Sequence, residues 1–329
     1  MNFILNPYNY LLLSSILSFT TFLFYSEGSL KIIYLSIPIF ILFIISYPFG
    51  KSIIQKNSTY YLNKELILSS IYWKVVAFFI VCFAIIEYLS FGFPLYKGVI
   101  YANFGFPIIH HLVVTSWILI FIKFKNKKIN LFLLIFAFLN PILIVNRDLF
   151  LLTIFALLCK KIFENKINIK LFVILLSVMF ILFGLIGQLR SGNALQLINL
   201  PFTFDSNEIN PILFWIILYM TSSTFNMSYN INNFSKNLYD TLINVFPEQY
   251  KWYLMSGEVT YFLYYILIFI ILTFLLIISK NKNYIPIYIY FLYQSLMGVT
   301  FGIKFFTTNS LMLILVFLIY FLLPKKISS

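Results

Sequence analysis

The sequence has 329 residues, of which 61% are hydrophobic and only 10% are charged. Because soluble globular domains carry about 25% charged residues, this composition excludes an ordinary soluble protein. The net charge of +13 comes from lysines in short loops between apolar segments, which is typical of membrane topology rather than of nucleic-acid binding. We therefore expect a single integral membrane domain over residues 1–329, with the lipid bilayer as its surroundings and no nucleic-acid partner.

Ten apolar segments are long enough to cross a membrane, for which a helix needs about 20 apolar residues. They are residues 9–25, 31–47, 67–90, 107–122, 130–146, 148–163, 168–187, 259–279, 284–302 and 307–323. The N-terminus lacks a basic region and a small-residue cleavage site, so the first segment is expected to be retained as a span. The segments predict an all-α fold, a polytopic transmembrane helical bundle of about 10–11 spans.

The lysines predict the orientation of these spans, because cytoplasmic loops carry an excess of basic residues. If the ten spans alternate, five clusters of lysine lie on one side of the membrane. The clusters are Lys51, Lys56 and Lys64; Lys123, Lys125, Lys127 and Lys128; Lys160, Lys161, Lys166 and Lys170; Lys280 and Lys282; and Lys325 and Lys326. Lys74, near the start of the third span, is expected to extend its side chain to the same side. Both termini are therefore predicted to be cytoplasmic.

A long region, residues 188–258, must begin and end on the external side. Its shorter apolar segment at 211–224 is predicted to be a re-entrant or interfacial helix, and two short crossings at 212–224 and 238–247 are the alternative. The candidates for substrate binding in this region are Asp205, Glu208, Trp215 and Tyr219. Aromatic rings suit stacking against sugars, but they equally suit a membrane interface, and the carboxylates are equally consistent with solvated loop charges.

Arginine occurs only twice among the 23 basic residues, at Arg147 and Arg190, and both positions are predicted to be external. The planar guanidinium of arginine differs from the lysine ammonium because it holds phosphate or carboxylate through two parallel hydrogen bonds. Because every other basic position is lysine, the two arginines indicate that the guanidinium itself is needed at these positions. The alternative is an interfacial anchor, or for Arg147 a local pair with Asp148.

The only two histidines, His110 and His111, are adjacent at the external start of the fourth span. They follow two Gly-x-Pro turns, Gly92-Phe93-Pro94 and Gly105-Phe106-Pro107. Neighbouring helix residues point about 100° apart, so one histidine can face a polar cavity while the other faces a neighbour. Histidine is a natural general base at neutral pH, and the alternative is a hydrogen-bonded interfacial residue. Glu87, near the external end of the third span, is the carboxylate that the sequence places deepest, and the alternative is that its side chain reaches the membrane interface.

Several common catalytic signatures are missing from the sequence, namely Asp-x-Asp, the Walker A loop, Ser-x-x-Lys and His-Glu-x-x-His. The cysteines, Cys82 and Cys159, both lie in apolar segments, which argues against a disulfide framework or a cysteine metal site. We therefore expect no metal ion and no nucleotide or other cofactor.

Taken together, these features resemble the O-antigen polymerase (Wzy-type) family of bacterial membrane proteins. The resemblance rests on the number of spans, the cytoplasmic ends, the long external region and four local patterns. These patterns are Gly92-x-Pro94, Pro107 to His111, Asn146-Arg147 and Gly187-x-x-Arg190-x-Gly192. The resemblance implies an inner-membrane glycosyltransferase of lipopolysaccharide biosynthesis. Such an enzyme transfers a growing glycan from undecaprenyl diphosphate to a lipid-linked repeat unit on the periplasmic face.

The resemblance also implies roles for individual residues. Arg147 and Arg190 would bind the diphosphates, and His110, His111 or an external carboxylate would deprotonate the acceptor hydroxyl. A chain-length regulator protein is a partner that the resemblance leaves open. The alternative functions are an O-antigen ligase, which uses the same donor, a lipid-linked oligosaccharide flippase or other transporter, and a membrane acyltransferase. A flippase predicts charged residues through the span interiors, and an acyltransferase predicts histidines on the cytoplasmic side.

Overall fold

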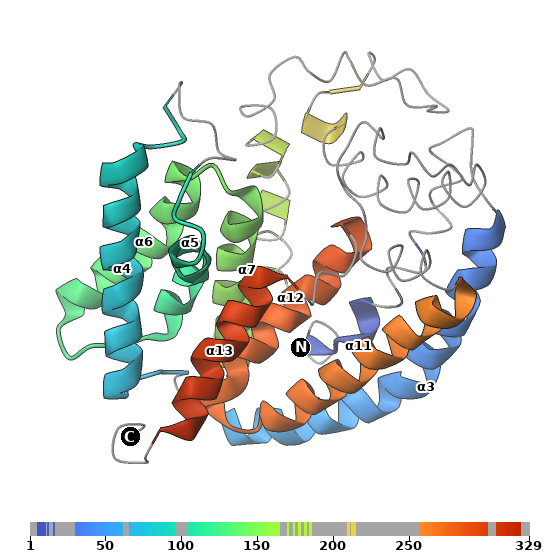
Figure 1. Cartoon of the computed structure of the whole chain (residues 1–329). Helices are drawn as coiled ribbons and strands as arrows, with labels where there is room; N and C mark the ends of the chain where they lie inside the picture. The colour runs from blue at the N-terminus through green and yellow to red at the C-terminus, as the bar shows by residue number, and fades with distance from the viewer. Residues whose placement is uncertain are drawn as a thin grey trace. The chain divides into compact units, whose positions relative to one another are not determined.

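In the computed structural model, the residues that the structure describes are predominantly helical. The described residues are 5–10, 12, 16, 30–61, 66–96, 104–164, 170, 174, 177–178, 181–182, 184–185, 209–210, 212–214, 257–301 and 307–323. The main helices are α3 (Leu30–Tyr61), α4 (Ile71–Phe91), α5 (Ile109–Val113), the 3-10 helix η2 (Val114–Phe121), α6 (Lys127–Leu143), α7 (Arg147–Phe163), α11 (Glu258–Ile278), the short 3-10 turn η6 (Lys282–Tyr284), α12 (Ile285–Phe301) and α13 (Thr308–Leu322) (Figure 1). The described residues form no sheet, and an isolated bridge between Leu68 and Ile122 is their single strand-like pairing.

Three of the described helices are long and apolar enough to cross a membrane. They are Tyr34–Lys56 within α3, Ile71–Phe91 and Glu258–Ile278. A helix of 21 residues is about 32 Å long, which matches the roughly 30 Å of a bilayer's hydrocarbon. Two further apolar helical segments, Ile109–Phe121 and Thr308–Leu322, are shorter. The helical part of the predicted fold is therefore confirmed for the described residues, and three of its helices fit a membrane by length and composition.

Helix α4 shows why these helices suit lipid rather than water. Its buried residues recur at helical spacing along one face and are Trp73, Val76, Ala77, Ile80, Ala84 and Glu87. Its opposite face is equally apolar, with Phe78, Phe79, Ile85, Ile86 and Leu89 all exposed. A helix in a soluble protein carries polar residues on its exposed face, whereas a helix that is apolar all round is either buried in protein or surrounded by lipid.

The chain divides into two compact units. Unit 1 comprises Met1–Asn57, Leu176–Ile277 and Phe291–Phe305, and unit 2 comprises Ser58–Leu175, Ile278–Tyr290 and Phe306–Ser329. Within unit 1, the Tyr8 hydroxyl lies 2.7 Å from Oγ1 of Thr273 on α11. A β-carbon on Gly184 would lie 2.4 Å from Cγ2 of Ile212, so a glycine at the end of the predicted seventh span permits close approach to the start of segment 211–224.

Unit 2 is built around η2, which contacts α4, α6, α7 and α13. All seven residues of η2 from Thr115 to Phe121 are buried. A 3-10 helix rises about 2.0 Å per residue, compared with 1.5 Å in an α-helix, so the same number of residues spans a greater distance. Asn140 of α6 contributes to holding this conformation, because its Nδ2 donates to the carbonyl of Val113, where α5 gives way to η2.

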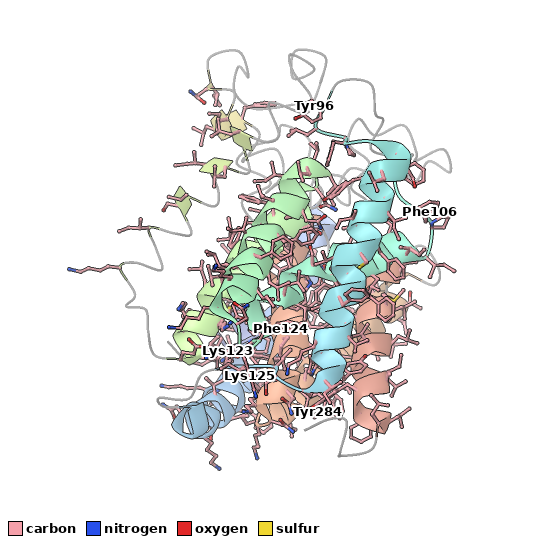
Figure 2. The ribbon with its side chains drawn as sticks, turned by 90° about the vertical axis from the view of Figure 1, so that its left-hand side faces the viewer. Tyr96, Phe106, Lys123, Phe124, Lys125 and Tyr284 are labelled. Carbon is pink, nitrogen blue, oxygen red and sulfur yellow. The ribbon has the colours of Figure 1, made fainter. Side chains whose placement is uncertain are left out.

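The two ends of unit 2 differ in chemistry. Figure 2 shows Tyr96 and Phe106 at one end and Lys123, Lys125 and Tyr284 at the other. The second end, which we call the lysine end, also carries the first turn of α6 and the last turn of α7. Its described lysines are Lys123, Lys125, Lys127, Lys128, Lys160, Lys161, Lys280 and Lys282.

Lys74 extends toward the lysine end, as the sequence predicts. Its Nζ lies 6.0 Å from the ring centre of Phe124, and Figure 2 shows Phe124 beside Lys123. Lys160 of α7 donates a hydrogen bond to the carbonyl of Ile120, at 2.7 Å, and so connects α7 to the last turn of η2 at the same end of the unit. The described lysines at residues 123–128, 160–161 and 280–282, which were predicted to share one side, therefore lie at one end of unit 2, whereas Lys51 and Lys56 belong to unit 1.

The helix boundaries follow the predicted spans with two clear differences. Helix α3 continues to Tyr61, past Pro48, whereas the predicted span ends at residue 47. The predicted span 107–122 is divided between α5 and η2. Most of the predicted spans 9–25 and 168–187, and most of region 188–258, lie outside the described residues.

Candidate functional site

Glu87 and His110 form a buried carboxylate–histidine pair at the end of unit 2 opposite the lysine end. Nδ1 of His110 lies 3.0 Å from Oε2 of Glu87. The Glu87 side chain is 0% exposed and that of His110 is 17% exposed, so the carboxylate is sealed while the imidazole still reaches the surface. Glu87 comes four residues before the end of α4 at Phe91, about 6 Å along the helix axis from that end.

The loop before α5 encloses this pair. The backbone N–H of Phe106 donates to Oε1 of Glu87 at 3.1 Å, and the N–H of His110 donates to the carbonyl of Phe106 at 2.9 Å. The ring of Phe104 meets the imidazole edge-on, with ring centres 5.5 Å apart. Gly105, between the two phenylalanines, has φ +94°, a conformation that L side chains rarely adopt.

His111 points to a different partner from its neighbour. Its Nδ1 lies 2.7 Å from Oδ1 of Asn309, in the first turn of α13. Thr307 caps this helix by accepting a hydrogen bond from the N–H of Ser310. The two adjacent histidines are therefore held by different helices, as their angular separation on a helix predicts. One is bound by a carboxylate and the other by a neutral amide.

A second buried polar group is hydrogen-bonded to Tyr88, the residue that follows Glu87 on α4. Asn140 of α6 is completely buried. Its Nδ2 lies 2.8 Å from Oγ of Ser116 on η2, and its Oδ1 accepts from the hydroxyl of Tyr88. Asn140 therefore connects α6 with α4 and η2 through hydrogen bonds. The connection to α4 is made at Tyr88, the residue directly after Glu87. The packing of α6 thereby helps to fix where Glu87 lies.

The turn from α6 to α7 lies at the same end as the pair, because the N–H of Leu95, after α4, donates to the carbonyl of Leu143 at 3.1 Å. The α6 helix ends in a Schellman arrangement: Asn146 N–H donates to Pro141 and Val145 N–H to Ile142. Val145 has φ +53° and is the non-glycine residue with positive φ among the described ones. A β-branched residue rarely adopts this conformation, and such strain persists only where the surrounding structure enforces it.

This turn positions Arg147, whose backbone begins α7. Asn146 caps the helix, because its Oδ1 accepts from the N–H of Leu149 at 3.0 Å. Arg147 is therefore fixed in backbone position at the end of unit 2 that carries Glu87 and His110. The structure describes the backbone of Arg147 and not its side chain.

The other predicted site residues lie outside the described residues. They are Arg190, Asp205, Glu208, Trp215 and Tyr219. Of the predicted set, the structure places His110, His111 and the backbone of Arg147 at the same end of unit 2. It adds Glu87, which was not predicted as a site residue, and two asparagines that make structural contacts outside the pair, Asn140 with Tyr88 and Asn309 with His111. The sequence signal for Glu87 was its position inside an apolar span, whereas the two asparagines give no comparable signal.

The arrangement can support acid–base chemistry. A histidine that donates through Nδ1 to a carboxylate presents Nε2 as an acceptor, which is the arrangement of a general base. No described residue forms a hydrogen bond with Nε2 of His110. Among the described residues there is no group of three or more histidine, cysteine, aspartate or glutamate side chains that could hold a metal ion.

Comparisons of the chain with protein-family models, with curated proteins and with solved structures find no match.

Proposed function

We propose that the protein is a polytopic helical membrane glycosyltransferase of the O-antigen polymerase kind. It lies in the bacterial inner membrane, crosses it about ten times, and keeps both termini in the cytoplasm. It transfers a growing glycan from undecaprenyl diphosphate to a lipid-linked repeat unit on the periplasmic face. Its partners are the lipid-linked oligosaccharides and the bilayer itself.

The proposed reaction needs a base at the acceptor and cations at the donor. The hydroxyl of the acceptor sugar gives its proton to a histidine, and its oxygen forms the new bond to the anomeric carbon of the donor. The bond from that carbon to the phosphate oxygen breaks, and undecaprenyl diphosphate leaves with the electron pair. Because negative charge develops on the leaving diphosphate, fixed guanidinium groups at that position stabilise the transition state. Arg147 and Arg190 supply these groups.

The observation that carries the proposal is the buried Glu87–His110 pair at the end of unit 2 opposite the lysine end. If the lysine end faces the cytoplasm, as the positive-inside tendency predicts, the pair faces the periplasm. The turn that begins α7 with Arg147 lies at that same end. A base and a phosphate-binding residue at the external edge of a bundle are what a periplasmic glycosyl transfer from a lipid diphosphate requires.

A deletion strain examined on a lipopolysaccharide gel tests this function. Loss of a polymerase leaves lipid A core that carries a single repeat unit, and the full ladder returns when the wild-type gene is supplied. Loss of a ligase leaves bare core, and loss of a flippase leaves no repeat unit outside the cell. Either of these two patterns would contradict the proposal.

A further inference from the structure

We infer that Glu87 is a positioning residue that fixes the tautomer of His110, and that His110 rather than His111 is the general base. The inference rests on the proposed function for the identity of the reaction. It concerns a choice that the sequence leaves open, since the two histidines are adjacent and chemically identical. The surroundings of the two imidazoles distinguish them.

The carboxylate of Glu87 is matched to two donors. Its Oε1 accepts from the backbone N–H of Phe106 at 3.1 Å, and its Oε2 accepts from Nδ1 of His110 at 3.0 Å. A carboxylate accepts hydrogen bonds and does not donate them, so the proton of the neutral imidazole lies on Nδ1. Because Glu87 is 0% exposed, no solvent competes for either oxygen. The pairing therefore leaves Nε2 of His110 with its lone pair available for a substrate proton.

His111 lacks this support. Its Nδ1 lies against the amide oxygen of Asn309, at 2.7 Å, and not against a carboxylate. Once a base has taken a proton, its imidazolium is stabilised far better by a buried negative charge than by a neutral amide, because a charge-assisted hydrogen bond is roughly twice as strong. The histidine beside Glu87 is therefore suited to accept a proton during the reaction, and the histidine beside Asn309 is suited to join α5 to α13.

Replacing Glu87 by glutamine isolates this role. Glutamine keeps the shape of the side chain but offers one acceptor oxygen and one NH₂ group. The N–H of Phe106 is a fixed donor, so the amide oxygen turns toward it and the NH₂ group faces Nδ1 of His110. Nδ1 must then accept, and the proton moves to Nε2. The corresponding change in the triad of serine proteases gives the wrong tautomer while leaving the geometry intact.

The experiment uses the fact that the chain contains two histidines. Full-length protein carrying a purification tag without histidine is labelled with ¹⁵N-histidine, reconstituted in lipid and examined by nuclear magnetic resonance at about pH 8, where an ordinary imidazole is neutral. The His111→Gln variant contains a single histidine, so its ring signals belong to His110. We expect protonated Nδ1 and unprotonated Nε2 in this variant, and the reverse after Glu87→Gln is added.

Polymerisation by the single variants completes the test. We expect Glu87→Gln to reduce the rate about 10²-fold or more, within the range that general-base catalysis supplies, while Asn309→Ala stays within about threefold of wild type. An unchanged tautomer in Glu87→Gln, or a reversed tautomer with full activity, would overturn the inference. If the wild-type protein makes no polymer, the proposed function fails instead, and the spectra still report whether Glu87 sets the tautomer.

Discussion

A β-carbon placed on Gly105 would lie 2.5 Å from Nδ1 of His110 and 2.6 Å from its Cγ. The backbone of the loop before α5 therefore packs directly against Nδ1 of His110, the atom that is hydrogen-bonded to Glu87. Because the ring is held by Glu87 on one side and by the edge of Phe104 on another, it cannot move away without losing one of these contacts. The absence of a side chain at residue 105 is thus part of how the pair is assembled.

Gly105→Ala is expected to reduce polymerisation at least about tenfold, since a displacement near 1 Å can cost about 10²-fold in rate. It should also lower the free energy of unfolding by about 1–3 kcal/mol because of the positive φ. The matched control is Gly257→Ala, because Gly257 also has positive φ, at 75°, but has nothing within 4 Å of its β-carbon position. The temperature of thermal unfolding should therefore fall in both variants, whereas the rate of polymerisation should fall in Gly105→Ala alone. Equal activity in the two variants would show that the contact with His110 has no role.

Asn140→Leu is expected to lower the free energy of unfolding by about 1–3 kcal/mol, because the buried hydroxyl of Ser116 and the partly buried hydroxyl of Tyr88 both lose their hydrogen bond to Asn140. A double-mutant cycle with Tyr88→Phe should give a coupling free energy of about 0.5–2 kcal/mol. The cycle of Asn140→Leu with Tyr96→Phe serves as the control, because Tyr96 is exposed and outside this group. Additive effects in the Tyr88 cycle would mean that the hydrogen bond contributes nothing to stability.

Much of this fold follows from the sequence, because its strongest signals are local. The apolar run at 67–90 becomes α4 at Ile71–Phe91, and the described lysines at 123–128, 160–161 and 280–282 lie at one end of unit 2, as the alternation of spans predicts. Both glycines of the Gly-Phe-Pro turns have positive φ, Gly92 at 77° and Gly105 at 94°. In each case residues close in sequence determine the result.

The parts that could not be predicted depend on contacts between distant segments. Hydropathy does not distinguish a buried 3-10 helix from a buried α-helix, so η2 could not be anticipated from its composition. Helix α3 continues through Pro48 and Gly50, which are poor helix formers, so local propensity places its end too early. The Schellman turn at Val145 carries no glycine signal. The pairing of Glu87 with His110 joins residues 23 positions apart, which only the packing of α4 against α5 brings together.

Lysine should not replace either arginine. We expect Arg147→Lys and Arg190→Lys each to reduce polymerisation about 10²-fold, because an ammonium keeps the charge but loses the two parallel hydrogen bonds to phosphate. Lys125→Arg, on the exposed lysine end, is the matched control and should leave the glycan ladder unchanged. The measurement is the length distribution on a lipopolysaccharide gel at equal protein level. Full-length ladders from both arginine variants would contradict a role for the guanidinium groups.

The two ends of unit 2 should be accessible from opposite sides of the membrane. Tyr96 and Lys125 are exposed and lie at opposite ends. A membrane-impermeant thiol reagent is expected to label Tyr96→Cys in intact spheroplasts, and to label Lys125→Cys only after the membrane is opened. The unaltered chain is the control, because its cysteines, Cys82 and Cys159, lie within α4 and α7. Labelling of both variants in intact spheroplasts, or the reverse order, would exclude the proposed topology.

The most direct measurement follows the glycan itself. Purified protein is reconstituted in liposomes with undecaprenyl-diphosphate-linked repeat units as the sole substrate, and the length of the lipid-linked products is measured over time. We predict a ladder of products that lengthen by whole repeat units, with release of undecaprenyl diphosphate and without any nucleotide sugar. If the repeat units stay at their original length, or lengthen only when a nucleotide sugar is supplied, the protein is not a polymerase of this kind.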